Sequence, residues 1–81
     1  MVGKTQNSEK APNVVAFGNR LREMRRAKGI SQEDLALLAD IDRSYMGRIE
    51  RGEFNPTLTK IYQLAKALEV DVVEFFMPKS E

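Results

Sequence analysis

The sequence predicts a compact all-α fold of five helices in one small domain. Apolar residues recur at spacings of three and four, which is the period of a helix with one buried face. Residues that cap or end helices stand between these runs, and no alternation of apolar and polar residues is long enough to indicate a β-strand. The chain has 81 residues, 42% of them apolar, which suffices for one modest core.

The first predicted helix begins near Phe17 and ends at Gly29, a residue that readily terminates helices. It is marked by four residues at helical spacing: Phe17, Leu21, Met24 and Lys28. Residues 1–14 are polar, contain Pro12 and show no period, so we expect a loose N-terminal tail. The folded domain is therefore expected to begin at residue 15.

The second and third helices are predicted from their caps. Ser31 can cap a helix over about Gln32–Ala39, and Asp34 completes the Ser-x-x-Asp form of a capping box. Asp42 is a good cap for a third helix that begins only a few residues later. The turn between them contains Asp40, and because aspartate tolerates a left-handed backbone, we expect this turn to form at small cost.

A fourth helix and a short fifth helix follow. Thr57 can cap the fourth, whose apolar positions are Leu58, Ile61, Leu64, Ala65 and Leu68. Asp71 and Glu74 repeat the capping arrangement for the fifth, VVEFF, which Pro78 stops. The domain is thus expected to span residues 15–77, with residues 78–81 as a frayed end.

The predicted core combines one face of each helix. It contains Leu35, Ile41, Met46, Ile49, Ile61, Leu64 and Leu68. Phe75 and Phe76 are neighbours on a short helix, so both can hardly face one small core. We expect one of them to close the monomer and the other to remain for a partner.

Composition excludes several classes of function. Cysteine and histidine are absent, which leaves no disulfide framework, no thiolate metal site and no histidine for acid–base catalysis. No metal, cofactor or small-molecule ligand is indicated. Neither a secretory signal nor a membrane span is present, so a cytoplasmic protein is expected. The net charge of +1 hides an uneven distribution, with five basic residues and one acid from Arg20 to Lys28.

The third predicted helix has two different sides. At about 100° per residue, its polar residues fall on an arc of roughly 140°. These are Arg43, Ser44, Gly47, Arg48 and Arg51, whereas Tyr45, Met46 and Ile49 lie opposite. Two short helices joined by a tight turn, the second with a basic outer face, form the helix-turn-helix arrangement.

Double-stranded DNA is the partner that such a face fits. A major groove about 12 Å wide admits one helix, and arginine there can bind guanine O6 and N7 through two parallel hydrogen bonds. The alternative is an ordinary solvated helix face, which the preceding helix and turn disfavour. Three further arginines of the first helix, Arg20, Arg22 and Arg26, would add phosphate attraction that weakens with salt.

The run ISQEDLALLADIDRSYMGRIERG, followed by NPTLTKIYQLAKALEVDVVEFF, resembles a known family. It is similar to the helix-turn-helix domain of the phage repressor and Cro type, and within it to the controller proteins of restriction-modification systems. The likeness spans about Phe17 to Phe76. It rests on the S-Q-E-D-L-A start, the R-I-E-R-G end of the third helix and the N-P-T-L opening of the fourth.

The resemblance implies roles for individual residues. Base contacts would come from Arg43, Ser44 and Arg48, with Gly47 allowing close approach. Contacts to phosphates or the groove edge would come from Gln32, Tyr45, Arg51 and Asn55. An ion pair would join Arg25 to Glu50, and a homodimer would form through Leu58, Val72, Phe75 and Phe76. Arg51 has an alternative explanation, because a last-turn arginine also favours the helix dipole.

The leading hypothesis is a homodimeric, sequence-specific transcriptional regulator that blocks or recruits RNA polymerase at an operator. An alternative, which does not exclude DNA binding, is an antitoxin or other protein-interaction module that covers its partner with the Phe75–Phe76 end. A small hydrolase is disfavoured by the missing histidine and cysteine.

Overall fold

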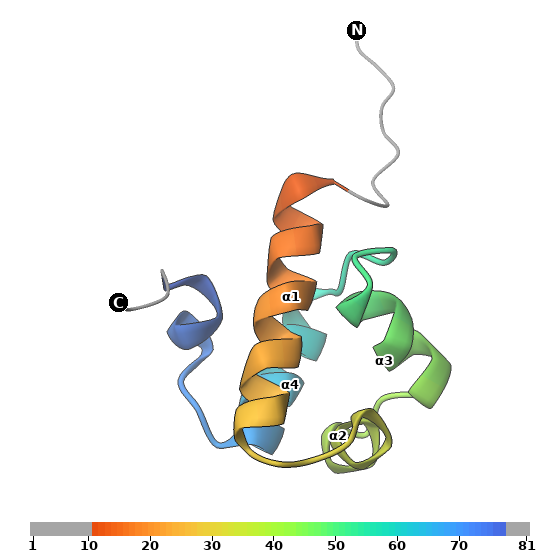
Figure 1. The fold of residues 1–81 in the computed structure, drawn as a ribbon, viewed down its shortest axis with the longest axis vertical. Coiled ribbons are helices and arrows are strands. Elements are labelled where there is room, and N and C mark those ends of the chain that lie inside the picture. Colours follow the sequence, from red (N-terminus) through yellow and green to blue (C-terminus); the bar gives the residue numbers. More distant parts are fainter. Residues whose placement is uncertain (1–10, 78–81) are drawn as a thin grey trace, which may run out of the picture.

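The fold is arranged around its longest helix. A computed structural model describes residues 11–77, and in this range α-helices follow one another without a strand. Helix α1 (Pro12–Ala27) runs along the length of the molecule, α2 (Gln32–Ala39) and α3 (Arg43–Glu50) lie to one side of it, and α4 (Leu58–Leu68) lies behind it (Figure 1). The bounds predicted for the second helix and the predicted caps of the third and fourth are confirmed.

The first helix begins earlier than the sequence predicted. It starts at Pro12, well before Phe17, because proline at the first helical position lacks only an N–H that would have no helical partner anyway. The backbone N–H of Val14 donates to the carbonyl of Ala11 at 3.0 Å, and the Val14 side chain is buried. The prediction of a loose tail is therefore wrong for its last three residues, while residues 1–10 lie outside the described range.

The turn between α2 and α3 has the predicted geometry. Ser31 Oγ accepts a hydrogen bond from the Asp34 backbone at 2.9 Å. Asp42 Oδ2 accepts from two backbone N–H groups of the first turn of α3, at 3.1 and 3.3 Å. Asp40 adopts φ 59° and ψ 46°, which is the left-handed conformation expected of it. The start of each helix and the turn between them are thus formed by local interactions.

The last element differs from the prediction. Residues 72–76 form a 3-10 helix, η1 (Val72–Phe76), on the opposite side of α1 from α3 (Figure 1). Five residues make fewer than two turns, and the tighter 3-10 form is common in such short pieces. The described chain therefore has four α-helices rather than five, although its all-α class is as predicted.

The core fills the space between the α-helices and η1. Its buried members are Phe17, Leu21, Met24, Leu35, Ala36, Ala39, Ile41, Met46, Ile49, Leu64, Ala65, Leu68 and Phe75. Ile61, which was predicted to belong to the core, is only half-buried against it. Phe75 is 4% exposed and Phe76 63% exposed, which confirms that one of these rings closes the monomer and the other does not.

Two glycines bring the end of α3 against α1. A methyl group on Gly18 would clash with the backbone carbonyl oxygen of Ile49 and lie 2.7 Å from that of Glu50. Gly52 has a φ of +74°, and a Cβ there would lie 2.8 Å from the Val15 side chain. The position of α3 relative to α1 therefore depends on glycine at both points. Helical periodicity gave no sign of either contact.

Candidate nucleic-acid interface

A buried ion pair fixes α3 on the rest of the fold. Arg25 donates from Nε to Glu50 Oε2 at 2.7 Å and from Nη2 to Oε1 at 3.0 Å, and both residues are buried. The hydrogen bond to Glu50 raises the pKa of Arg25 above its ordinary value, against the lowering effect of burial. The two residues that the family resemblance paired are thus brought together by the structure, as a bidentate contact between α1 and α3.

Glu50 also binds side chains from two further positions, Gln32 through its carboxylate and Arg22 through its backbone carbonyl and, more weakly, its carboxylate at 3.8 Å. Gln32 Nε2 donates to Glu50 Oε1 at 3.0 Å, which joins the start of α2 to the end of α3. Arg22 Nη2 donates to the backbone carbonyl of Glu50 at 2.8 Å, and Arg20 Nε donates to that of Glu74 at 3.0 Å. Arg20 and Arg22, expected from the sequence to attract phosphates, therefore bind carbonyl groups of the protein itself.

The polar residues of α3 line one shallow hollow together with side chains that flank the helix. The lining consists of Gln32, Arg43, Ser44, Gly47, Arg48 and Arg51. This set contains every residue expected to contact bases. It also contains two of those expected to contact phosphates. Arg43, Ser44 and Arg48 are exposed, so their side chains are accessible to a ligand outside the protein.

Gly47 lies close to two side chains that line the same hollow. A Cβ at Gly47 would lie 3.0 Å from Arg51 Nη1 and 3.3 Å from Gln32 Oε1. Gly47 itself is buried. Because Gly47 has no side chain, it leaves room for the side chains of Arg51 and Gln32. This reason for glycine lies within the protein, and the sequence did not reveal it.

Arg51 is held at the edge of the hollow by a carboxylate. Its Nε donates to Glu53 Oε2 and its Nη2 to Glu53 Oε1, each at 3.1 Å. The hydrogen bond to Glu53 raises the pKa of Arg51 above its ordinary value. Neighbours two positions apart do not face each other within a helix, so sequence reasoning missed Glu53. Their contact forms because α3 ends at Glu50 and the chain turns at Gly52, between the two residues.

An aromatic pair lies beside Arg48. The guanidinium carbon of Arg48 is 5.4 Å from the centroid of the Phe54 ring. Phe54 and Tyr45 meet edge to face, with centroids 4.5 Å apart and planes at 73°. Tyr45 is half-buried and packs on the core, while Lys60 Nζ lies 5.7 Å from the centroid of its ring. Asn55, the remaining residue expected to contact phosphates, is exposed and follows Phe54 in the loop between α3 and α4.

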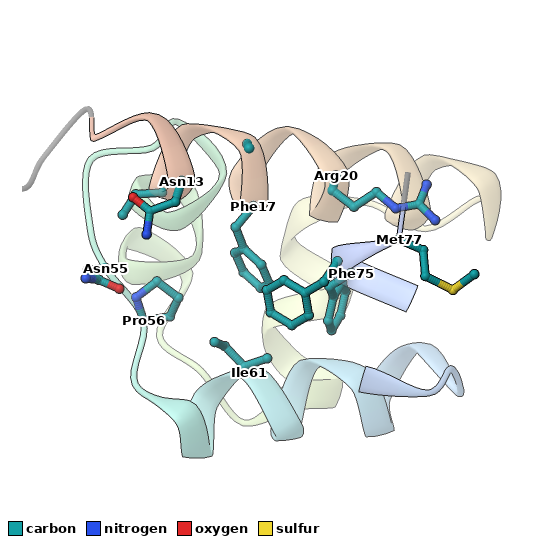
Figure 2. Close-up of a pocket in the computed structure, with 11 residues that line it drawn as sticks. Asn13, Phe17, Arg20, Asn55, Pro56, Ile61, Phe75 and Met77 are labelled. Atoms are coloured by element: carbon teal, nitrogen blue, oxygen red, sulfur yellow. The ribbon is translucent and has the colours of Figure 1, made fainter. Parts of the chain in front are cut away.

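The residues expected to form a dimer interface fall into three environments. Leu58 is 68% exposed and Phe76 is likewise exposed. Val72 is half-buried. Phe75 lies in the core, where it meets Phe17 at a centroid distance of 5.1 Å, so its expected contact with a partner is corrected. Figure 2 shows a groove between α1 and α4 into which Phe17, Ile61 and Phe75 point.

Over residues 11–77, no group of three or more acidic residues is placed to hold a metal ion. None of the helices described is both long and apolar enough to span a membrane. Within this range, the basic hollow on α3 is the feature that best fits a charged macromolecule.

Comparison with known proteins gives this arrangement a context. The family model described as helix-turn-helix matches residues 21–75. The restriction-modification controller protein C.AhdI from Aeromonas hydrophila has a similar solved structure, with a TM-score of 0.80 and 52% identity, covering 82% of this chain and 100% of that one. Control protein C.BamHI from Bacillus amyloliquefaciens is 41% identical over 63 residues, which are 73% of this chain and 78% of that protein.

A phage protein is also similar. The immunity repressor protein of Bacillus phage phi105 is 36% identical over 58 residues, which are 72% of this chain and 40% of the repressor. The resemblance to phage repressors and controller proteins, first drawn from sequence motifs, is therefore confirmed. The chain belongs to the helix-turn-helix family of DNA-binding transcriptional regulators.

Proposed function

We propose that this protein acts as a homodimer on a two-fold symmetric operator, with α3 of each protomer in the major groove. The observation that carries the proposal is the hollow that gathers Gln32, Arg43, Ser44, Gly47, Arg48 and Arg51 on one face. A rigid frame supports this face, because the buried Glu50 carboxylate at the end of α3 accepts hydrogen bonds from Arg25 of α1 and from Gln32 at the start of α2. A site on such a frame keeps its geometry when it meets DNA.

Residues of the hollow divide by their chemistry. Arg43 and Arg48 can each donate two parallel hydrogen bonds to a guanine, and Ser44 can donate to or accept from a base edge. Gln32 stands at the helix N-terminus of α2, where backbone N–H groups favour a phosphate. Arg51 lines the hollow and suits the sugar-phosphate backbone. Asn55 is exposed but lines the groove between α1 and α4, and we assign it a backbone contact beside the hollow. Tyr45 contributes through its hydroxyl at the groove edge.

The dimer is proposed to form through α4 and η1, neither of which lines the hollow. Leu58 and Phe76 are exposed apolar side chains from α4 and η1, and Val72 adds a partly covered surface beside them. Half-sites in operators of such dimers are about 34–36 Å apart, which is one turn of DNA. A contact through α4 and η1 would leave both α3 helices free to reach two half-sites.

The relatives support a proposal for the regulatory role. Controller proteins of restriction-modification systems are similar to this chain over most of its length, and we assign the protein to control of such genes in the cytoplasm. It would block or recruit RNA polymerase according to which of its sites is filled. No inducer is part of the proposal, so protein concentration is the regulatory variable.

Selection from a random duplex library at about physiological salt tests the proposal. Specific binding there typically exceeds non-specific binding by about 10³-fold or more, so sequencing of the retained DNA would give the motif. A two-fold symmetric motif supports the dimeric reader. Binding to any duplex without an enriched motif would overturn it. The exposed Phe76 end would then point to a protein partner, as in an antitoxin.

A further inference from the structure

The base-reading face has a neighbour whose role goes beyond packing. We propose that Phe54 is a positioning residue, which holds the Arg48 guanidinium in the orientation that reads a base pair. The inference rests on the proposed function, in which Arg48 contacts a base. It adds a residue outside α3 that governs specificity.

A chain of side-chain contacts runs from the core to Arg48. Tyr45 packs on the core cluster, the Phe54 ring stands against Tyr45 at 4.5 Å, and Arg48 lies over Phe54 at 5.4 Å. Cations within about 6 Å of an aromatic centroid are attracted by the ring. A continuous line of contacts therefore joins the interior of the domain to a side chain expected to enter the groove.

The backbone places Phe54 beside Arg48. Gly52 turns the chain with a φ of +74°, and the N–H of Glu53 then donates to the carbonyl of Arg48 itself at 2.8 Å. This bond folds the loop back onto α3 one residue before Phe54. The ring is consequently attached to the helix turn that carries the arginine, rather than to a distant segment.

Positioning matters because arginine is long and has many rotamers. On an open helix face, part of the energy of two hydrogen bonds to guanine is lost in ordering the side chain. A ring on one side restricts the guanidinium plane before DNA arrives, which favours the bidentate contact over a single bond to a neighbouring phosphate. The expected consequence is sharper discrimination between base pairs, with a smaller change in affinity for non-specific DNA.

The experiment compares Phe54→Leu and Phe54→Tyr in the full chain. Leucine keeps apolar bulk but has no ring, whereas tyrosine keeps the aromatic ring. Dissociation constants are measured for the selected operator and for operators changed at the base pair whose preference Arg48→Ala removes. We expect Phe54→Leu to lower discrimination at that base pair about two- to fivefold, the range of an exposed cation–π contact, and Phe54→Tyr to retain it.

Two results would overturn the proposal. One is an equal loss of affinity for every duplex in Phe54→Leu. The other is wild-type discrimination at that base pair in Phe54→Leu, which would show that Arg48 reads it without the ring. If Arg48→Ala itself changes no base preference, the base-reading function fails instead, and the two failures are distinguishable.

A measurement without DNA tests the geometry alone. The Nε–H resonance of Arg48 in the free protein should be shifted upfield by the Phe54 ring, and Phe54→Leu should abolish that shift while Phe54→Tyr preserves it. Melting temperatures of the three proteins, followed by circular dichroism, show whether the fold is retained. An Arg48 resonance that is the same in Phe54→Leu as in the wild type would contradict the positioning role, whatever the DNA data show.

Discussion

At the scale of single residues, the edge of the proposed interface contains an internal competitor for DNA. Glu53 binds Arg51 through both carboxylate oxygens at 3.1 Å, in the way that a phosphate would bind it. In the proposed complex, Arg51 would have to exchange this partner, or share it, to contact the DNA backbone. The carboxylate also repels nearby phosphates.

We therefore expect Glu53→Gln to bind every duplex more tightly. The gain should be several-fold at low salt and should shrink as salt rises, with the log–log salt slope steeper by up to about 0.9 for one added phosphate contact. Fluorescence anisotropy titrations at several salt concentrations measure both quantities. Glu69→Gln, an equal charge change at the end of α4, is the control. Equal affinities for Glu53→Gln and wild type would show that Glu53 does not compete.

The two exposed arginines of α3 should behave differently from other cations. Arg43→Ala and Arg48→Ala are each expected to remove roughly 1–3 kcal/mol of preference at one base pair of the operator. Lys66→Ala, which removes a charge from the last turn of α4, should leave base preference unchanged. Competition titrations with single-substitution operators give these values. Unaltered preference in both arginine variants would remove them from the set of base-contacting residues.

The parts of the site that sequence could indicate are those governed by helical period. An arc of polar residues on the third helix follows from 100° per residue, and the structure places its members around one hollow. Glu53 and Phe54 were missed because their contacts depend on how the chain turns at Gly52. No local pattern encodes that direction.

At the scale of elements, the local signals were the most informative. Ser31, Asp42 and Thr57 cap helices as predicted, because a cap involves atoms only two or three residues apart. The start of α1 was predicted too late because Pro12 was interpreted as a residue of a loose tail, whereas proline is also common at the first position of a helix. The form of η1 was missed since a five-residue segment has too little periodicity to separate a 3-10 turn from an α-turn.

The packing of α1 against α3 predicts the sign of the stability change in a Gly18→Ala variant. Helix propensity alone expects Gly18→Ala to stabilise the protein by about 1 kcal/mol. The Ile49 and Glu50 carbonyls that a Cβ would meet are backbone atoms that cannot move aside. We therefore expect destabilisation of about 1–3 kcal/mol, as for other overpacked sites. Chemical denaturation measures the free energy of unfolding.

Gly47→Ala is the matched comparison, because the same substitution within a helix would meet only the ends of two flexible side chains, Arg51 and Gln32. It should leave the free energy of unfolding nearly unchanged or raise it, and should weaken DNA binding by displacing those side chains. A stabilised Gly18→Ala variant would contradict the close packing of α1 and α3. A destabilised Gly47→Ala variant would contradict the distinction between the two glycines.

At the scale of the whole molecule, the basic hollow and the proposed apolar contact are contributed by different elements. The hollow is lined by α3 and the residues that flank it, whereas Leu58 and Phe76 are exposed on α4 and η1, and η1 lies on the opposite side of α1 from α3 (Figure 1). Sequence reasoning anticipated this separation from the two adjacent phenylalanines, but not which of them is buried. Phe75 faces Phe17 across the core, a choice fixed by how η1 docks on α1.

The proposed dimer makes a final prediction that separates assembly from DNA reading. Phe76→Asp and Leu58→Asp place a charge on the apolar surface that a second copy would bury, so each should shift the protein to monomers in sedimentation velocity. Operator affinity should then fall roughly 100-fold or more, because two linked half-sites become independent. Weak binding to an isolated half-site should persist, since α3 is unaltered. Leu38→Asp is the control, as Leu38 is 62% exposed on α2 and should not change the oligomeric state. If both variants remain dimeric with wild-type operator affinity, the partner surface lies elsewhere on the molecule.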